Sequence, residues 1–327
     1  PAAWAQFDKI NGGERVRQRE LQTDARGFIT ELLSKSISEQ WLDDSLSELD
    51  GDRLLEFLTR FGDLNSDHQY AGSSRSGYAN NGLMAEGLLL EPHGIEEIVA
   101  SDFWRIGMNF SQAASQSSVL VPVGGMDKIL DAFVAKLPNV IQTNSRVVDI
   151  RTSDSNVTVQ YQNKGQMHTS RADYCLNSIP GQILAGVANN FDSEFQKTLE
   201  TRPRGKLSKI GLQMNNRFWE KEGIYGGNSW TGQDITQIMY PSHGYHQNKG
   251  VVIGGYIYSG AINDKVMSMS AEQRIEMAKR QGEKVHPGYA NAVENGVSVA
   301  WYRMNHILGC TARNHPGAVQ HVLQAPQ

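Results

Sequence analysis

The chain has 327 residues, enough for one large domain or two domains with a substantial core. Its 31 basic and 35 acidic residues give a net charge of -4, which indicates neither a nucleic-acid surface nor a charged disordered tail. Hydrophobic residues make up 39% of the sequence. No apolar run approaches the roughly 20 residues that cross a bilayer. We therefore expect a folded protein with no nucleic-acid partner and no membrane partner.

The sequence leaves the compartment open. Cys175 and Cys310 are its two cysteines, too few for a disulfide framework or a metal cage. Cys175 lies in a segment that predicts a buried strand, so we interpret both cysteines as packed thiols. The first residues show no basic segment followed by an apolar one, and no signal peptide is visible. Cytoplasmic, periplasmic and secreted locations all stay possible for a soluble protein of this kind.

The first third of the chain is predicted to be helical. Apolar residues recur at near-helical intervals from about Gly12 to Lys35, from Ser45 to Phe61 and from Gly94 to Phe103. Asn, Asp, Ser and Gly dominate residues 63–83, which predicts a loop. We interpret residues 1–118 as a helical domain.

The pattern changes near Val119. Gly124-Gly125 leads into a predicted helix from Met126 to Leu137, and a second helix is predicted from Ala271 to Gly282, which would be its C-cap. The segments with strand character are 147–150, 157–161, 174–176, 208–214, 235–240, 251–259 and 297–302. The predicted class is α+β, a helical part followed by a mostly antiparallel sheet. Residues 119–150 would form a helix and strand of a cofactor domain, and residues 151–327 a substrate-binding sheet domain.

Several common catalytic motifs are absent from the sequence. It contains no G-x-G-x-x-G after a strand, no G-x-x-x-x-G-K-[ST], no G-x-S-x-G and no H-E-x-x-H. His243 and His246 are the one close pair of histidines, and no cysteine or carboxylate pair accompanies them. We therefore expect no metal site.

A series of segments in a fixed order carries a family resemblance. The segments are Val121-Pro122-Val123-Gly124-Gly125-Met126-Asp127, Asn144-Ser145-Arg146-Val147-Val148-Asp149-Ile150, Lys209, Arg217-Phe218-Trp219-Glu220, Ile224-Tyr225-Gly226-Gly227, Tyr240-Pro241-Ser242-His243, Gly254-Gly255-Tyr256-Ile257-Tyr258 and Val299-Ala300-Trp301-Tyr302-Arg303-Met304. In this order they resemble the central portion of the flavin amine oxidase family, closest to bacterial L-amino-acid oxidases. The Gly-Gly-Met-Asp element is weakly specific alone, whereas the whole series is specific and spans nearly the whole chain.

The resemblance also shows what this sequence lacks. Members of that family begin with a Rossmann-type strand, Gly-rich loop and helix that place the FAD pyrophosphate at a helix N-terminus. No such motif precedes Gly124, no counterpart of the family's carboxylate-binding Arg is identifiable, and the chain stops about where a second flavin segment would begin. We therefore expect the Rossmann-type FAD half to be missing or partial here, with FAD-binding segments on another chain or in a part of the protein outside this sequence.

Lys209 is the candidate catalytic residue. It is a lone cation in an apolar strand, and periodicity alone favours an edge-strand lysine that reaches water or pairs with Glu220 or Glu222. The resemblance implies that Lys209 holds a water against the flavin N5, where oxygen reacts with the reduced ring. A cation there would stabilise the negative charge that develops on reduced oxygen.

Four residues are candidates for substrate binding. Tyr256 and Tyr258 lie two apart on one strand, so their side chains share a face, either as an aromatic ladder in a core or in a site. The resemblance implies that Tyr256 hydrogen-bonds the substrate carboxylate and that Tyr258 lines the side-chain pocket. It places His306 near the substrate amine and Phe110 in the helical wall of an entry funnel.

Two residues are candidates for FAD binding. A tryptophan on a strand among small apolar residues is often a core residue, but the resemblance places Trp301 against the flavin isoalloxazine. It also implies that the backbone N–H and C=O of Val147 pair with the adenine, a role that depends on strand conformation.

The implied activity is that of an FAD-dependent L-amino-acid oxidase. Hydride passes from the substrate Cα to FAD and oxygen accepts the electrons, giving a 2-oxo acid, ammonia and hydrogen peroxide. The expected partners are an L-amino acid and O2, and family analogy favours a homodimer. A non-catalytic module that binds an amino acid or a partner chain is one alternative. A polyamine or aryl-amine oxidase is another, and Tyr256 argues against it.

Overall fold

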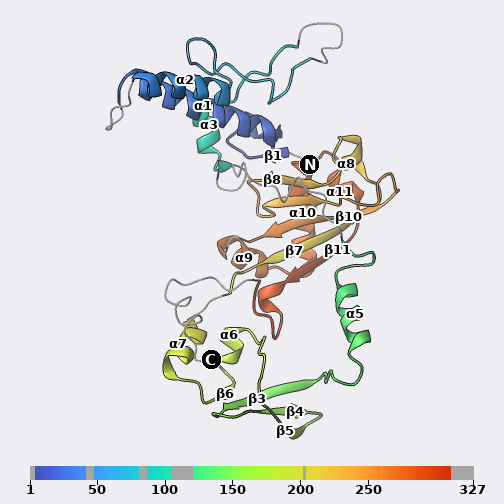
Figure 1. Ribbon diagram of the computed structural model, residues 1–327. Helices are drawn as coiled ribbons and strands as arrows, with labels where there is room; N and C mark the ends of the chain where they lie inside the picture. Colours follow the sequence, from blue (N-terminus) through green and yellow to red (C-terminus); the bar gives the residue numbers. More distant parts are fainter. Residues whose placement is uncertain are drawn as a thin grey trace. The chain divides into compact units, whose positions relative to one another are not determined.

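The computed structural model describes residues 4–41, 48–80, 87–104, 121–201, 204–258 and 260–310. The chain divides into two compact units, residues 1–116 with 208–299 and residues 117–207 with 300–327. One unit contains a seven-stranded sheet and the other a four-stranded sheet (Figure 1). Helices and mostly antiparallel strands occur in both, which confirms the predicted α+β class.

The first unit begins with two short strands and a helical hairpin. Its elements are β1 (Trp4–Gln6), the 3-10 turn η1 (Asn11–Gly13), β2 (Val16–Arg17), α1 (Gln18–Ser38), α2 (Glu48–Gly62) and α3 (Ile95–Ala100). Helices α1 and α2 lie side by side (Figure 1). The core that joins these elements to the sheet consists of Ala5, Phe7, Ile10, Val16, Leu21, Ala25, Ile98, Phe103 and Trp230.

The first predicted helix begins later than expected. We predicted it from Gly12, but α1 starts at Gln18. Gly12 and Gly13 have φ of +64° and +88° and form a turn, and Val16 then pairs with Ala5 of β1. Apolar spacing alone did not reveal that the segment before Gln18 is used for strand pairing.

The large sheet has the strand order β11-β7-β10-β9-β8-β1-β2. Its remaining strands are β7 (Ser208–Met214), β8 (Gly227–Thr231), β9 (Gln237–Tyr240), β10 (Gly250–Ile257) and β11 (Val293–Ala300). β10 pairs antiparallel with β7 and β9, and β9 pairs antiparallel with β8, whereas β1 runs parallel to β8.

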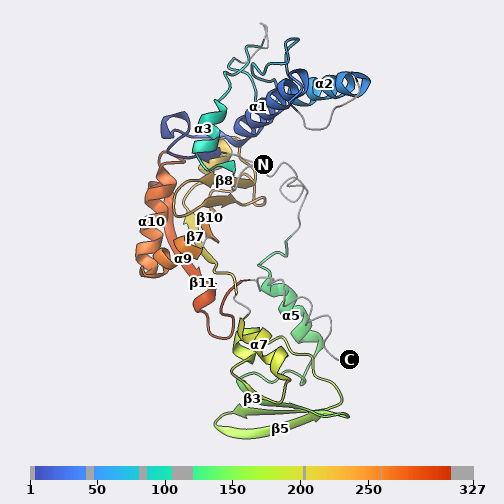
Figure 2. The ribbon, with the colours of Figure 1, turned by 90° about the vertical axis from the view of Figure 1, so that its left-hand side faces the viewer.

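Helices cover one face of this sheet. They are α9 (Gly260–Met267) and α10 (Ala271–Glu283) (Figure 2), and the short helix α11 (Tyr289–Ala292) contacts α10. The same unit contains the short helix α8 (Phe218–Lys221). A capping box between Ser270 and Gln273 starts α10. Gly282 is not the predicted C-cap, because α10 continues to Glu283. A Cβ at Gly282 would lie 2.4 Å from the Tyr289 ring, so glycine is needed there for packing.

The second unit is built on a three-stranded meander. Its elements are α5 (Asp127–Lys136), β3 (Ser145–Thr152), β4 (Val157–Asn163), β5 (Gln166–Ala172), α6 (Gly181–Leu184), β6 (Ala188–Asn189), α7 (Ser193–Thr201) and the 3-10 turn η3 (Trp301–Arg303). β3, β4 and β5 are successively antiparallel, and β6 pairs parallel with β3. Ile150, Leu184 and Leu199 form its buried core.

Two predictions for this unit are wrong. The third strand is β5, not residues 174–176, because a two-residue turn at Lys164 and Gly165 starts it at once and its pairing with β4 ends at Ala172. Cys175 and Cys310 are exposed rather than packed.

Among the residues that the structure describes, no helix is both long and apolar enough to cross a membrane.

Candidate functional site

Lys209 lies on the face of the large sheet opposite to α9. The neighbouring residue, Ser208, is fully buried and its hydroxyl donates a hydrogen bond to Asn263 of α9 at 2.6 Å. Because side chains alternate along a strand, Lys209 projects from the other face, where every second residue of β7 is only half-buried. This is the local reason that a cation is tolerated in an otherwise apolar strand.

A β-bulge in β10 decides which residue faces Lys209. The register with β7 shifts between Ile253 and Gly255, so that Tyr256 lies directly opposite Lys209. Without the extra residue, Gly255 would occupy that place. Bulges re-aim side chains in this way, and here the bulge brings Tyr256 onto the half-buried face that Lys209 shares.

Lys209, Tyr256 and Tyr258 form one cluster, which we call the aromatic–lysine cluster. The Nζ of Lys209 lies 5.1 Å from the centroid of the Tyr256 ring, and the rings of Tyr256 and Tyr258 are 6.1 Å apart. Tyr258 is 39% exposed, and burial together with the neighbouring Tyr256 raises its pKa. The structure thus brings together the candidate catalytic residue and two of the four candidate substrate-binding residues.

The expected carboxylate partners of Lys209 are used elsewhere. Glu220 pairs with Arg217 at 2.5 Å, and Glu222 pairs with Arg15 at 2.5 Å. Among the described residues, no carboxylate forms an ion pair with Lys209. The interpretation of Lys209 as a partner of Glu220 or Glu222 is therefore wrong, because both glutamates are held by arginines that the sequence pattern did not connect to them.

The backbone of Tyr256 is fixed from the neighbouring segment. Its N–H donates to the carbonyl of Ile235 at 3.2 Å, and its carbonyl accepts a hydrogen bond from the hydroxyl of Thr236. The N–H of Ile235 is in turn bonded to the side-chain oxygen of Gln281 at 3.0 Å, on α10. These polar residues were missed by the sequence reasoning, since their contacts join segments that are far apart in the chain.

The Arg217-Phe218-Trp219-Glu220 motif has a structural role in this unit. Trp219 has no exposed surface, and Arg217 lies over its ring at 5.0 Å. Arg217 also donates to the carbonyl of His243 at 2.9 Å. The motif therefore anchors a loop through a buried arginine.

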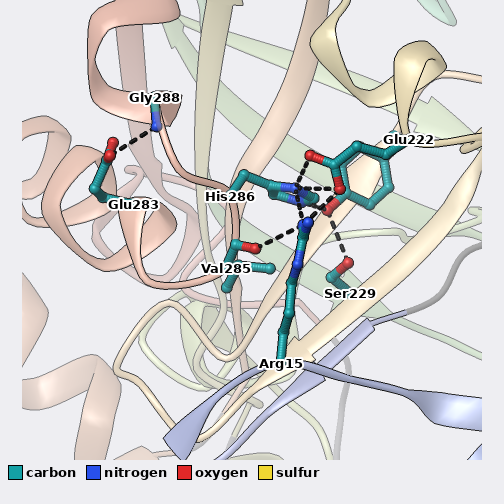
Figure 3. Close-up of polar contacts among 8 residues, drawn as sticks. Arg15, Glu222, Ser229, Glu283, Val285, His286 and Gly288 are labelled. Atoms are coloured by element: carbon teal, nitrogen blue, oxygen red, sulfur yellow. Dashed lines mark hydrogen bonds and ion pairs between the residues drawn. The ribbon is translucent and has the colours of Figure 1, made fainter.

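A buried polar network lies elsewhere in the same unit (Figure 3). Nδ1 of His286, a residue with no exposed surface, lies 3.0 Å from Glu222, and Arg15 donates to Glu222 and to the carbonyl of Val285. On the other side of the ring, Nε2 of His286 is hydrogen-bonded to the hydroxyl of Tyr240. No sequence pattern indicated this network, because its members come from separate segments.

The network changes the acidity of two of its groups. Burial acts to raise the pKa of Glu222, but the hydrogen bond to His286 and the charge of Arg15 outweigh it, so its pKa lies below the ordinary value. Burial raises the pKa of Tyr240, whose hydroxyl also donates to Ser229 at 2.8 Å. At neutral pH, Glu222 is therefore charged and Tyr240 is neutral.

The second unit holds the other candidates that the structure describes. Trp301 is not on a strand: β11 ends at Ala300, and Trp301 begins the turn η3 as a half-buried residue whose N–H bonds to the carbonyl of Leu207 at 3.1 Å. It is not a core tryptophan. His306 is exposed in a turn with φ of +68°. Phe110 lies outside the described residues.

The chain belongs to the flavin-containing amine oxidoreductase family, whose sequence model matches residues 8–327. The flavin-dependent L-tryptophan oxidase of Lentzea aerocolonigenes is 28% identical over 181 residues, which cover 54% of this chain and 38% of that protein. An L-amino-acid oxidase of Siganus canaliculatus is 33% identical over 188 residues, which cover 54% of this chain and 34% of that protein. The chain therefore spans little more than a third of the length of these two relatives.

The fold agrees with the family. The structure of a putrescine oxidase bound to putrescine superimposes with a TM-score of 0.60 at 14% identity, covering 99% of this chain and 72% of that one. At this identity the match shows the fold alone. The predicted resemblance to flavin amine oxidases, closest to L-amino-acid oxidases, is confirmed.

The family match and the flavin-dependent relatives make FAD the cofactor of this protein. Val147 lies on β3, opposite Tyr161 of β4. β6 pairs with β3 at Asp149 and Ile150, and among the described strands none pairs with that edge of β3 at Val147.

Proposed function

We propose that this protein is an FAD-dependent oxidase of L-amino acids that releases a 2-oxo acid, ammonia and hydrogen peroxide. The observation that carries the proposal is the aromatic–lysine cluster. A lysine that projects from the half-buried face of the β7–β10 pair, directly opposite a tyrosine, provides one cation and one hydroxyl donor side by side. The L-amino-acid oxidases among its relatives support this choice of substrate class.

FAD, when bound, accepts the hydride from the substrate Cα and passes electrons to oxygen. The protein's own residues would position the substrate and stabilise the charge that forms on oxygen. We assign to the hydroxyl of Tyr256 a hydrogen bond to the substrate carboxylate, and to Tyr258 a wall of the side-chain pocket. An aligned substrate reacts faster because its orientation is fixed before the chemical step.

Lys209 would act on the oxygen side of the reaction. Lys209 is a half-buried residue, so its charge is less screened by water than that of a fully exposed lysine. A fixed positive charge stabilises the anion that forms when oxygen accepts an electron. Trp301, Val147 and His306 are assigned to the cofactor and the substrate amine as the resemblance implies, and a homodimer is the proposed assembly.

The test begins with the full-length protein purified with its flavin. Anaerobic addition of an L-amino acid should bleach the flavin bands, whereas the amine formed by removing its carboxyl group should not. Mixing reduced enzyme with oxygen should then restore the bands slowly in K209M and rapidly in the wild type. Bleaching by amines but not by L-amino acids would contradict the proposed substrate class, and rapid reoxidation of K209M would contradict the role of Lys209.

A control variant separates lysine loss from charge loss in general. Lys279 is a lysine of the same unit, in an ion pair with Glu276 on α10. K279M removes one positive charge of similar exposure from the helix-covered side of the sheet. We expect K279M to be reoxidised at the wild-type rate.

A further inference from the structure

We propose that the aromatic ring of Tyr256 is a positioning element for the ammonium of Lys209, in addition to any role of its hydroxyl. The inference rests on the proposed function of Lys209 in the oxygen reaction. It assigns two separable tasks to one side chain: the ring holds the lysine, and the hydroxyl binds the substrate.

The ammonium of Lys209 needs a partner to hold it in one position. A lysine side chain has four flexible methylene groups, and its ammonium takes no fixed place without a partner. In the described part of the chain, Glu220 is paired with Arg217, and Glu222 is paired with Arg15 and His286. The Tyr256 ring, with its centroid 5.1 Å from Nζ, is the contact that the structure shows for this ammonium.

The contact between the Lys209 ammonium and the Tyr256 ring is attractive. The face of an aromatic ring carries partial negative charge and attracts a cation within about 6 Å of the centroid. The attraction is stronger where water is partly excluded, as at the half-buried Lys209. A ring does not neutralise the ammonium, whereas a carboxylate would accept a hydrogen bond from it and neutralise its charge.

The Tyr256 ring is itself held in place by its neighbours. The bulge between Ile253 and Gly255 sets Tyr256 opposite Lys209. The contacts to Ile235 and Thr236 fix its backbone on both sides of the Cα. Tyr258 packs against it with an angle of 55° between the rings. The bulge, the two backbone hydrogen bonds and the ring contact together hold the Tyr256 ring opposite Lys209.

The two tasks can be separated by substitution. Y256F keeps the ring and removes the hydroxyl, so it should weaken binding of the amino acid while reoxidation by oxygen stays at the wild-type rate. Y256L removes both, so reoxidation should also fall by about tenfold, the effect of losing a partly desolvated cation–π contact. A purely structural tyrosine would give no such division between the two half-reactions.

A measurement that needs no turnover tests the contact directly. In protein labelled with 13C at the ε-carbon of lysine, the signal absent from K209M identifies Lys209. A ring 5.1 Å away should shift this signal upfield of the exposed lysines. We expect the shift in the wild type and in Y256F, and its loss in Y256L. Melting temperatures would show that each variant is folded.

The outcomes separate this inference from the proposed function. A Lys209 signal that does not move in Y256L, or a Y256L enzyme that is reoxidised as fast as the wild type while K209M is slow, would overturn the positioning role. A Lys209 signal that moves as expected, together with normal reoxidation of K209M, would support the contact and refute the oxygen role of Lys209.

Discussion

The carboxylate of Glu222 lies 3.0 and 3.1 Å, through its two oxygens, from Nδ1 of His286. His286 precedes α11, Glu222 follows α8, and Tyr240 on β9 contacts the opposite nitrogen of the same ring, so one imidazole joins three segments. Glu283 closes the same turn by accepting the N–H of Gly288 at 2.7 Å (Figure 3). The network is a tether between the helical layer and the sheet.

This tether predicts a pH dependence of stability. The pKa of Glu222 in the folded protein lies below its ordinary value of 4.5. The stabilisation that ionised Glu222 contributes is therefore present above its unfolded-state pKa. It is lost as the pH falls through the lower pKa that Glu222 has in the folded protein. E222Q should cost about 1–3 kcal/mol at neutral pH, since hydrogen bonds to a charged group are lost, and less as the pH is lowered. Denaturant unfolding from pH 7 to pH 3 measures both.

Glu276 provides the matched control for Glu222. It is also a paired glutamate, 2.8 Å from Lys279, but its side chain is 67% exposed. An exposed ion pair contributes about 0–1 kcal/mol. We expect E276Q to unfold as the wild type does. Equal pH profiles for E222Q and the wild type would show that the network does not stabilise the fold through this charge.

Two helical glycines give a second prediction, with opposite signs. A Cβ on Gly27 of α1 would lie 2.2 Å from the ring of Tyr70, whose hydroxyl donates to the buried Asp24 at 2.7 Å. G27A should therefore destabilise by about 1–3 kcal/mol through overpacking. Gly51 of α2 has nothing within 4 Å of the same position, so G51A should stabilise by roughly 0.5–1 kcal/mol. Thermal unfolding of both variants is the measurement, and equal signs would contradict the packing.

Local pattern was sufficient for part of the fold. The strand predicted at 208–214 is β7 with the same limits, because alternation of buried and half-buried residues is a property of neighbouring residues. The helix predicted at 271–282 is α10 to within one residue. The class of the fold followed from the order of such elements.

The parts that failed depend on distant contacts. The bulge that places Tyr256 opposite Lys209 arises where Gly254 packs closely against Leu212 and Tyr289, and both Gly254 and Tyr289 are far from Lys209 in the sequence. The end of β11 before Trp301 is likewise set by a bond to Leu207. Periodicity placed Lys209 and Tyr256 on strands, but only the register shows that they are opposite each other.

Gly254 gives a third prediction. A Cβ at this position would lie 2.4 Å from Cδ1 of Leu212 and 2.8 Å from the hydroxyl of Tyr289. G254A should destabilise by about 1–3 kcal/mol and should weaken amino-acid binding, since the bulge that orients Tyr256 must shift. G260A is the control, because nothing lies within 4 Å of that position. Denaturant unfolding and flavin titration with substrate report the two effects, and a G254A protein with unchanged binding would show that Tyr256 does not depend on the bulge.

Asn263 gives the last prediction, because it fixes both strands of the site from the covered face. Its side-chain oxygen accepts from Ser208 at 2.6 Å, and its side-chain nitrogen donates to the carbonyl of Ile257 at 2.9 Å. These two residues directly adjoin Lys209 and Tyr256 in the sequence. N263A leaves both groups buried without this partner, which costs roughly 1–3 kcal/mol for each.

A double variant separates this bond from general packing. Replacing both Ser208 and Asn263 by apolar residues, as in S208A with N263L, removes the unsatisfied hydroxyl and should recover part of the stability lost in N263L alone. The bond to Ile257 stays lost in both, so recovery should be incomplete. Strict additivity of the two single effects would show that the Ser208–Asn263 bond does not couple β7 to α9. The 13C signal of Lys209 reports whether the same loss of anchoring displaces the ammonium from Tyr256.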